Sequence, residues 1–526
     1  MFNNNLLMGA AAATSGTSVV SVDNSALFIK GNNENLSRTP SSAGNRDTWT
    51  FSTWVYRTLA NTEEIIFNAG ADDNNRTCLK FNSNNIQYFH FDSGGVTDVL
   101  TTSAVYRDTG WYNIVLAVDT TQAVEDDRVI IYVNGERVSA FGTANYPAQN
   151  TDTDVNATVL HVIGAGIGGS NDLDAYLAET VLIDGTQLTP TSFGAYDSSG
   201  LYWTPKSSTE IKALTFGTNG FYLDNTTNAQ TDASGEGNNW TNNNTVTTDV
   251  NSPTNMYAVQ NPLTITNTYP STLANGNLKQ TGNSAGSWAS GILATVPCDG
   301  GGKFYWEAKC IGLYGTSSYI GLGIAPMDLP RLDHVDGSSN FVTPGETGYQ
   351  GGSILFNGSS YTNLRSNSAA QDTNISGSLT IAVNDFMQIA FDSSNGKIWY
   401  GKNNTWYNSG DPANGTGQNS TLTADKFWYP WFGTYTNSDI WQINYGASDF
   451  QYTPPTGFNK ITTSQIASDT TRTASDSKKY FQTVLYEGNG GQQRVGNFQP
   501  FTDSFTVSKG ALFPATGYLN RTFDEA

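Results

Sequence analysis

Basic residues are scarce in this chain. Its 526 residues include 26 lysines and arginines against 46 aspartates and glutamates, which gives a formal charge of −20. A surface of this sign repels phosphate backbones and anionic lipid headgroups. The apolar runs are also shorter than the roughly 18–20 residues that a membrane-spanning helix needs. We therefore expect no nucleic-acid partner and no membrane insertion.

Cysteine is scarce as well. Cys78, Cys298 and Cys310 are too few to build a disulfide framework in a chain of this length. Their spacing fits no zinc motif. Cys298 and Cys310 could pair if they faced each other across a hairpin. Otherwise, the three residues are expected to be buried free thiols.

Glycine and aromatic residues, in contrast, are abundant, with 53 glycines and 12% Phe, Trp and Tyr. Together with many Asn, Thr and Ser, they favour strands joined by turns over helices. Residues 49–56 alternate large and small side chains, which is typical of a half-buried strand. Residues 128–138 predict a hairpin with Asn134-Gly135 at its tip, because this pair accepts the positive φ angles of a type I′ turn. One short helix is expected, at 189–194.

The length leaves room for two large domains. We predict an all-β fold with two antiparallel, jelly-roll-like β-sandwiches in tandem, separated by polar, turn-rich stretches. The expected divisions are a leader or anchor tail at 1–17, a sandwich at 18–225, a linker at 226–256, a second sandwich at 257–460, a linker at 461–483 and a last segment at 484–526.

The last segment partly repeats the start of the first sandwich. Ala511-Leu512-Phe513 matches Ala26-Leu27-Phe28, and the flanking positions match as well if the loop between them differs by two residues. Residues 484–526 therefore either begin a second copy of the first domain or supply a strand that another chain completes.

The first block resembles a laminin-G-like domain of the concanavalin-A-like lectin/glucanase superfamily. The resemblance covers roughly residues 18–225. It depends on four segments in order, which are 26–38, 49–56, 111–138 and 175–185. These segments are fairly specific for the fold and say little about a ligand.

The second block resembles a SPRY domain, another curved β-sandwich. Its matching segments are 304–307, 320–324, 391–398 and 441–446. It departs from the SPRY pattern in a tyrosine-rich insertion at about 341–365.

The two modules in this order look similar to large virion proteins of tailed bacteriophages, in particular those of marine hosts. That resemblance implies a tail-fibre-like or head-fibre-like adhesion component, made in the host cytoplasm and located in the virion. Its implied partners are other virion proteins, a host-surface glycan and further copies of itself, most simply as a trimer. One alternative is a purely structural capsid or tail decoration protein. A second alternative is a glycan-degrading enzyme.

No catalytic constellation is evident in the sequence. Glucanases of this fold carry E-x-D-x-x-E on one strand, and the nearest pair here, Glu179 and Asp184, has the wrong spacing. His90 and His161 lie in predicted strands and are expected to be packed or surface residues. His334 lies in a polar loop beside carboxylates. We therefore predict that the chain is not an enzyme and has no catalytic residues.

Ligand binding is predicted at loop residues. Sugar recognition requires exposed aromatic faces beside amides and carboxylates, and the loop aromatics of this kind are Tyr349, Tyr361, Trp406 and Tyr407. The laminin-G-like resemblance also implies a Ca²⁺ ion held by loop oxygens. The candidate ligands are Asp72, Asp73, Asp172 and Asp174. Asx turns explain such aspartates equally well.

Overall fold

A computed structural model describes residues 20–465 of the chain. Within that range it leaves out 61, 93–94, 198–199, 201, 266–269, 284–290, 299–300, 315–318, 327–343, 345–349, 358–360, 367–368, 375–379 and 423–426. The predicted leader, the segment 484–526, His334 and Tyr349 lie outside the described residues. No helix among the described residues is long and apolar enough to cross a membrane.

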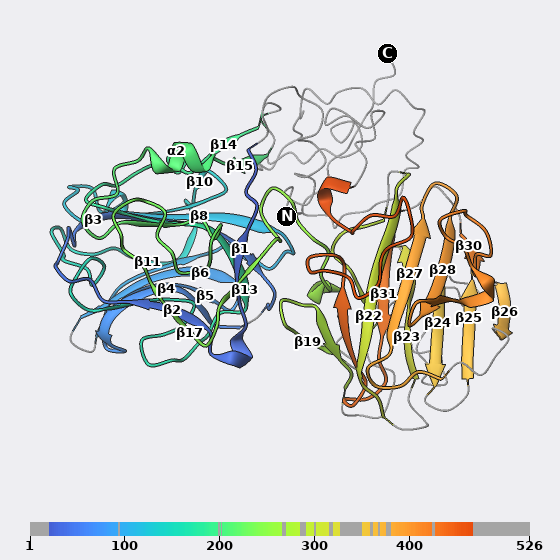
Figure 1. Cartoon of the computed structure of the whole chain (residues 1–526). Coiled ribbons are helices and arrows are strands. Elements are labelled where there is room, and N and C mark those ends of the chain that lie inside the picture. Colours follow the sequence, from blue (N-terminus) through green and yellow to red (C-terminus); the bar gives the residue numbers. More distant parts are fainter. Residues whose placement is uncertain are drawn as a thin grey trace, which may run out of the picture. The chain divides into compact units, whose positions relative to one another are not determined.

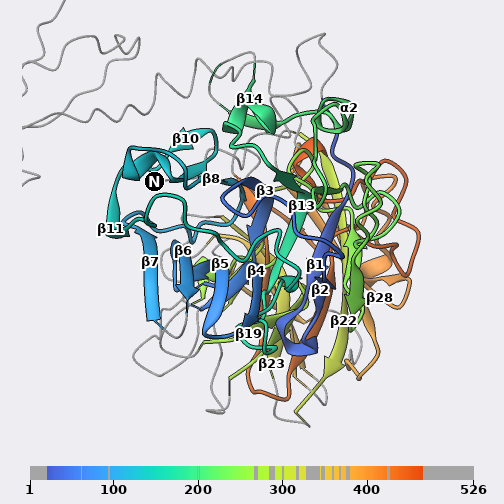
Figure 2. The ribbon, with the colours of Figure 1, turned by 90° about the vertical axis from the view of Figure 1, so that its left-hand side faces the viewer.

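The predicted all-β fold is confirmed, and the first sandwich consists of two antiparallel sheets (Figures 1 and 2). The first sheet has the order β10 (Glu136–Arg137), β9 (Val129–Val133), β8 (Trp111–Asp119), β3 (Thr48–Arg57), β13 (Ala175–Asp184), β1 (Ser25–Phe28) and β18 (Thr247–Asp249), with β16 (Phe221–Leu223) also paired to β13. The second has the order β11 (Phe141–Asn145), β7 (Gly95–Thr102), β6 (Asn85–Asp92), β5 (Asn75–Asn82), β4 (Glu64–Asp72), β12 (Leu160–Ile163), β2 (Asn35–Arg38) and β17 (Thr241–Asn243).

Alternating side chains form the core between these sheets. On β3, Phe51 and Val55 point into the core, and Phe51 stacks on Phe67 of β4 with ring centroids 4.5 Å apart. The hairpin predicted at 128–138 is present as β9–β10. Asn134 and Gly135 adopt φ angles of 50° and 84° at its tip, as a type I′ turn requires.

The expected linker at 226–256 is wrong for its second half. Thr241–Asn243 pairs with β2, and Thr247–Asp249 pairs with β1, so this segment extends both sheets of the first sandwich. Trp240 is buried and packs edge-on against Phe221 at 5.0 Å. The stretch looks like a linker because its two edge strands consist of exposed and half-exposed polar residues.

Short elements cover part of the outer face of β13. They are η4 (Pro190–Ser192), the hairpin of β14 (Gly194–Tyr196) and β15 (Trp203–Pro205), and α2 (Ser208–Lys212). The helix expected at 189–194 is therefore a single 3₁₀ turn. The α-helix lies later, where Ser207 and Glu210 form a capping box.

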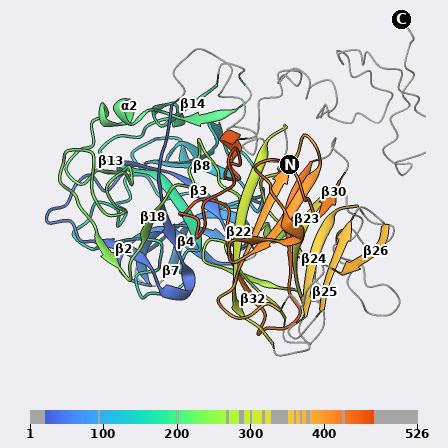
Figure 3. The ribbon, with the colours of Figure 1, turned by 45° about the vertical axis from the view of Figure 1, so that its right-hand side comes forward.

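The second sandwich also has two antiparallel sheets (Figures 1 and 3). One has the order β19 (Thr272–Ala274), β20 (Lys279–Thr281), β32 (Ile440–Asn444), β22 (Lys303–Gly312), β27 (Phe386–Asp392), β28 (Lys397–Lys402) and β29 (Thr405–Trp406), with β30 (Ser420–Thr421) on β28. The other has the order β21 (Ile292–Leu293), β31 (Trp428–Gly433), β23 (Tyr319–Pro326), β24 (Gly352–Asn357), β25 (Tyr361–Ser366) and β26 (Ala369–Asn374). The remaining 3₁₀ turns are η2 (Lys30–Asn32), η3 (Glu125–Asp127), η5 (Pro262–Thr264), η7 (Tyr407–Ser409) and η8 (Thr463–Gln465).

The alternation on β22 determines which residues face outward from this sandwich. Phe304 and Trp306 point into the core, whereas Tyr305 points to the outer face. All three cysteines are buried free thiols, as predicted, so Cys298 and Cys310 form no disulfide.

Candidate functional site

A groove of about 770 Å³ lies beside the outer face of β22. Its wall is the irregular segment that follows β32. The lining residues combine aromatic rings with amide and hydroxyl groups; they are Asn255, Tyr257, Asp449, Phe450, Gln451, Tyr452, Thr453, Pro454, Phe458, Asn459, Lys460, Thr462, Ser464 and Gln465. We call residues 449–465 the strap and the hollow beside them the strap groove.

A buried carboxylate fixes the start of the strap. Glu307 on β22 is 1% exposed, and its Oε2 accepts the backbone N–H of Gln451 at 2.7 Å. Its Oε1 accepts the N–H of Tyr452 at 2.9 Å and the hydroxyl of Tyr305 at 2.6 Å. Gln388 in turn donates to the Tyr305 hydroxyl at 3.0 Å. Hydrogen bonds to a charged acceptor are among the stronger ones, so this end of the strap is held firmly.

Backbone pairing fixes the other end of the strap. The N–H of Asn459 donates to the Lys303 carbonyl at 2.8 Å, and its carbonyl accepts the Tyr305 N–H at 2.8 Å. Further along, the Ile461 carbonyl accepts the Ala258 N–H at 3.0 Å. The exposed side chains of the strap therefore project from a backbone that is tied down at both ends.

Aromatic residues of the sheet form a base under the strap. Phe450 meets Tyr305 edge-on at 4.9 Å, and Phe458 meets Trp399 edge-on at 6.1 Å. Burial raises the pKa of the Tyr305 hydroxyl, which stays a neutral donor to Glu307. Phe450 and Tyr452 are half-buried lining residues of the groove, and the Tyr452 ring also meets Phe386 edge-on at 6.0 Å.

Polar groups lie beside these rings. Gln451 and Asn459 are exposed, and the Oδ1 of Asn255 is buried with no hydrogen-bond partner. Amides offer both donors and acceptors, which suits a ligand rich in hydroxyl groups. The strap groove is thus equipped to bind a polar ligand that also has apolar faces.

Trp406 and Tyr407, two of the four aromatic residues predicted to bind ligand, do not line this groove. Trp406 is half-buried on β29, and its ring meets Tyr305 at 6.4 Å on the same sheet face as the strap. Tyr407 is 7% exposed in η7, and burial raises the pKa of its hydroxyl. Tyr361 begins β25, while Tyr349 lies outside the described residues. Their assignment as ligand contacts stays untested.

Three of the four predicted Ca²⁺ ligands have protein partners, whereas the Oδ1 of Asp172 is buried with no hydrogen-bond partner. Asp72 Oδ1 accepts the Asn74 N–H at 2.8 Å, an Asx turn that lowers the pKa of Asp72. Asp73 pairs with Arg76 at 2.6 Å. Burial raises the pKa values of Asp172 and Asp174, which opposes their charged form. In the part of the chain that the structure describes, no group of three or more His, Cys, Asp or Glu side chains could hold a metal ion. The assignment of these aspartates to a Ca²⁺ site stays a prediction.

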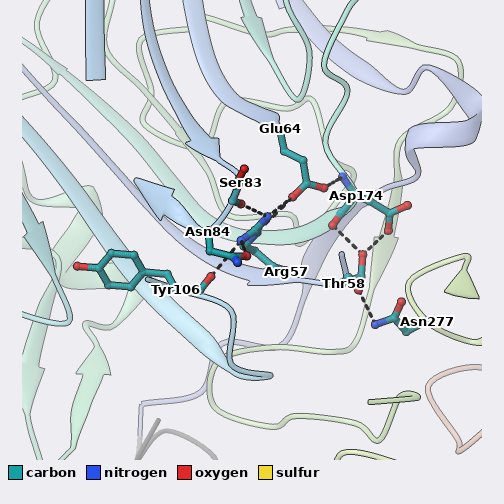
Figure 4. Close-up of polar contacts among 8 residues, drawn as sticks. All are labelled: Arg57, Thr58, Glu64, Ser83, Asn84, Tyr106, Asp174 and Asn277. Atoms are coloured by element: carbon teal, nitrogen blue, oxygen red, sulfur yellow. Dashed lines mark hydrogen bonds and ion pairs between the residues drawn. The ribbon is translucent and has the colours of Figure 1, made fainter. Parts of the chain in front are cut away.

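Asp174 instead belongs to a buried polar network (Figure 4). Its side chain accepts the hydroxyl of Thr58, and its backbone N–H donates to Glu64 Oε1 at 3.1 Å. The carbonyl of Thr58 accepts Asn277 Nδ2 at 2.8 Å. Asp174 is a candidate Ca²⁺ ligand from the sequence, and in the structure its hydrogen-bond partners are protein groups.

Arg57 is the cation of this network. Its Nη2 donates to Glu64 Oε2 at 2.8 Å and to the Ser83 carbonyl at 3.0 Å (Figure 4). Its Nη1 donates to the Tyr106 carbonyl at 3.0 Å and to Asn84 Oδ1 at 3.4 Å. The side chains of Arg57 and Glu64 are 2% and 0% exposed. Because the charges of Arg57 and Glu64 are paired with each other and with backbone groups, we infer a structural role for the network.

The described residues considered for catalysis are buried as well. His161 Nε2 accepts the Asn156 N–H at 3.0 Å, and burial lowers the pKa of this imidazole to about 4. His90 is 4% exposed, with Nδ1 3.0 Å from the Thr77 hydroxyl. Glu179 is 7% exposed and accepts the Tyr222 hydroxyl at 2.5 Å. Both described histidines are therefore packed residues.

Comparison with known proteins places the first sandwich in a broad family. Residues 30–192 match the profile of the concanavalin A-like lectin/glucanases superfamily, of laminin G type. The match falls within the block predicted to be laminin-G-like, which confirms that prediction. No curated protein matches the chain significantly.

Three solved structures illustrate the structural neighbourhood. The SPRY domain of human HERC1 is 16% identical with a TM-score of 0.26, covering 37% of this chain and 99% of that domain. Domains LG4-5 of the mouse laminin alpha1 chain are 9% identical with a TM-score of 0.28, covering 87% and 97%. A heptameric SAP-like pentraxin from Limulus polyphemus is 16% identical with a TM-score of 0.25, covering 32% and 80%. A SPRY domain is thus among the neighbours, and the assignment of residues 257–460 to that family stays a prediction. The chain carries a laminin-G-like domain of the lectin/glucanase type, a fold typical of binding modules.

Proposed function

We propose that this chain is a carbohydrate-binding protein and that a saccharide occupies the strap groove. The observation that carries the proposal is the juxtaposition, in the groove lining, of the half-buried aromatic residues Phe450 and Tyr452 with the amides of Gln451 and Asn459. The C–H faces of a sugar ring pack on aromatic side chains, while its hydroxyls exchange hydrogen bonds with amides. A strap tied down at both ends presents these groups without a large loss of conformational entropy.

The groove favours binding over cleavage. Glycoside hydrolysis ordinarily requires two carboxyl groups flanking the scissile bond. Among the described lining residues, Asp449 is the sole carboxylate. Glu307 lies behind the strap, where it accepts two backbone N–H groups. We therefore propose a non-enzymatic role.

A glycan array probed with the full chain tests this proposal. We expect a restricted set of glycans to bind, and Gln451→Ala and Tyr452→Ala to weaken that binding about tenfold or more, since each removes a direct contact. Tyr314→Ala is the matched control, because Tyr314 is 55% exposed on the same sandwich but outside the groove. Equal binding by all three variants would place the saccharide elsewhere, and an array without any bound glycan would remove the proposal.

We further propose that the chain acts in a virion, as a fibre-type adhesion component of a tailed bacteriophage. The support is the order of its two modules, which resembles that of such proteins, and an acidic composition that suits solubility in salty water. Immunogold labelling of purified particles tests the setting, with label expected on a fibre or spike. Label confined to the capsid shell would favour the purely structural alternative, and label absent from particles would contradict the virion setting.

A further inference from the structure

A lysine is held at the rim of the strap groove. The Nζ of Lys460 lies 5.8 Å from the centroid of the Tyr257 ring. The stem of Lys460 lies against Gly446, which adopts a φ of 108°; a Cβ at Gly446 would come within 2.5 Å of Lys460 Cγ. A glycine at this position therefore gives the stem its space, and the ring of Tyr257 lies beneath the ammonium group.

The ammonium group of Lys460 has no internal counterion among the described residues. No carboxylate of the described chain lies within 4.0 Å of it, whereas Lys80, Arg76 and Arg57 all form ion pairs. In a chain with a formal charge of −20, a cation without a counterion among the described residues is a notable feature of a groove. Such a group is available to an anionic ligand.

Asp449 is the opposing charge in the same lining. It is exposed, and its described hydrogen bond is made by its backbone carbonyl, which accepts Asn444 Nδ2 at 3.0 Å. Its carboxylate is therefore not held by a neighbour, unlike the stem of Lys460. An anion at the groove would be attracted by Lys460 and repelled by Asp449.

We propose that the strap groove selects an anionic saccharide, one with a carboxylate or a sulfate group, and that Lys460 binds this group while the sugar ring lies against the neighbouring aromatics. This inference rests on the proposed carbohydrate binding and adds the charge of the ligand. Neutralising Lys460 and neutralising Asp449 should change the affinity for an anion in opposite directions, so these two lining residues allow a direct test.

Isothermal titration of the full chain tests it with three probes. They are an oligogalacturonide, the same oligosaccharide as its neutral methyl ester, and a sulfated oligosaccharide of matched length. We expect the ester to bind about tenfold more weakly than at least one anionic probe, and added salt to weaken anion binding. The better of the two anionic probes identifies the group as carboxylate or sulfate.

Two charge variants complete the test. Lys460→Gln should weaken binding of the anionic probe about tenfold and leave the ester unchanged, while Asp449→Asn should strengthen anion binding. Equal affinity for ester and anion, or a Lys460→Gln variant that binds the anion like the wild type, overturns the anionic selection. In that case neutral glycans that still bind in the Gln451-dependent manner leave the proposed function standing, so the two failures are distinguishable.

Discussion

Glu179 has an unusual backbone conformation. Its φ is 52°, whereas the other described non-glycine residues with positive φ are asparagines, serines and one threonine. It lies at a β-bulge on β13, between the stretch paired with β1 and the stretch paired with β16. The Tyr222 hydroxyl satisfies it, and burial raises its pKa to about 8. Glu179 therefore places a neutral carboxyl group at a strained backbone position between the two paired stretches of β13.

Replacing Glu179 by glutamine should flatten the pH dependence of stability. The pKa of Glu179 is higher in the folded than in the unfolded chain, so the folded chain binds the proton more tightly. The free energy of unfolding should therefore fall as pH rises from about 4.5 to about 8. Glu179→Gln mimics the protonated form and lacks this term, which amounts to roughly 4–5 kcal/mol. Urea unfolding at both pH values checks this, and parallel profiles for the two proteins would contradict it.

The Arg57–Glu64 pair should be intolerant of single substitutions. Arg57→Met leaves the carboxylate of Glu64 buried without its cation, and we expect a loss of about 3–5 kcal/mol in the free energy of unfolding. A double variant, Arg57→Met with Glu64→Leu, removes both charges and should lose less. Thermal unfolding of four proteins gives the comparison: the wild type, Arg57→Met, Glu64→Leu and the double variant. If the double variant were as unstable as the sum of the two single changes, the charges would not be coupled.

Single residues of the candidate site were the hardest to predict from the sequence. A search for exposed loop aromatics points to Trp406, which does lie on the correct sheet face but packs against Tyr305. Phe450 and Tyr452 carry no periodic pattern, because they lie in irregular backbone. Their placement depends on Glu307, more than 140 residues earlier in the chain, and no local signal reveals that contact.

At the scale of elements, the strap should depend on one side chain. Glu307→Ala removes the acceptor for Gln451 and Tyr452, so we expect the strap to lose its fixed position and saccharide binding to be lost. Hydrogen–deuterium exchange should show faster exchange over 449–453 while β22 and β27 stay protected. Lys402→Ala, on β28 of the same sheet, is the control, because Lys402 pairs with Asp385, and it should leave the strap unchanged. Unaltered strap exchange in Glu307→Ala would show that the other contacts suffice.

The core strands were more predictable than the edge strands. Alternation of apolar and polar side chains revealed β3 and β8, and the Asn-Gly pair revealed the turn between β9 and β10. The strands β17 and β18 were missed because edge strands are held by backbone hydrogen bonds and bury little. Hydrophobic periodicity in a sequence indicates burial, so it does not reveal strands that pair through their backbone without burying side chains.

At the scale of the whole molecule, the first sandwich should need residues beyond its predicted boundary. A fragment of residues 18–225 lacks β17 and β18, and it also lacks Trp240, which packs on Phe221. We expect it to unfold at a lower temperature than a fragment of residues 18–256, or to fail to fold. Circular dichroism melts of the two fragments check this. Equal melting temperatures would indicate that the first sandwich ends near residue 225, as the sequence predicts.

The scarcity of basic residues has a more specific meaning once the fold is known. Several cations of the described chain, such as Arg57 and Lys80, form ion pairs with carboxylates of the same chain. Lys460 is an exposed cation at a groove, and its value as a ligand contact comes from this contrast. Net charge disfavours phosphate polymers as partners but says nothing about a single groove.

The most direct test of the central claim is to map the bound saccharide. Hydrogen–deuterium exchange of the full chain, with and without the best array glycan, would report which backbone amides it protects. We predict protection over the strap, residues 449–465, and in the segment around Tyr257 that lines the same groove. Protection confined to the sheets of the first sandwich, with the strap unchanged, would contradict the account.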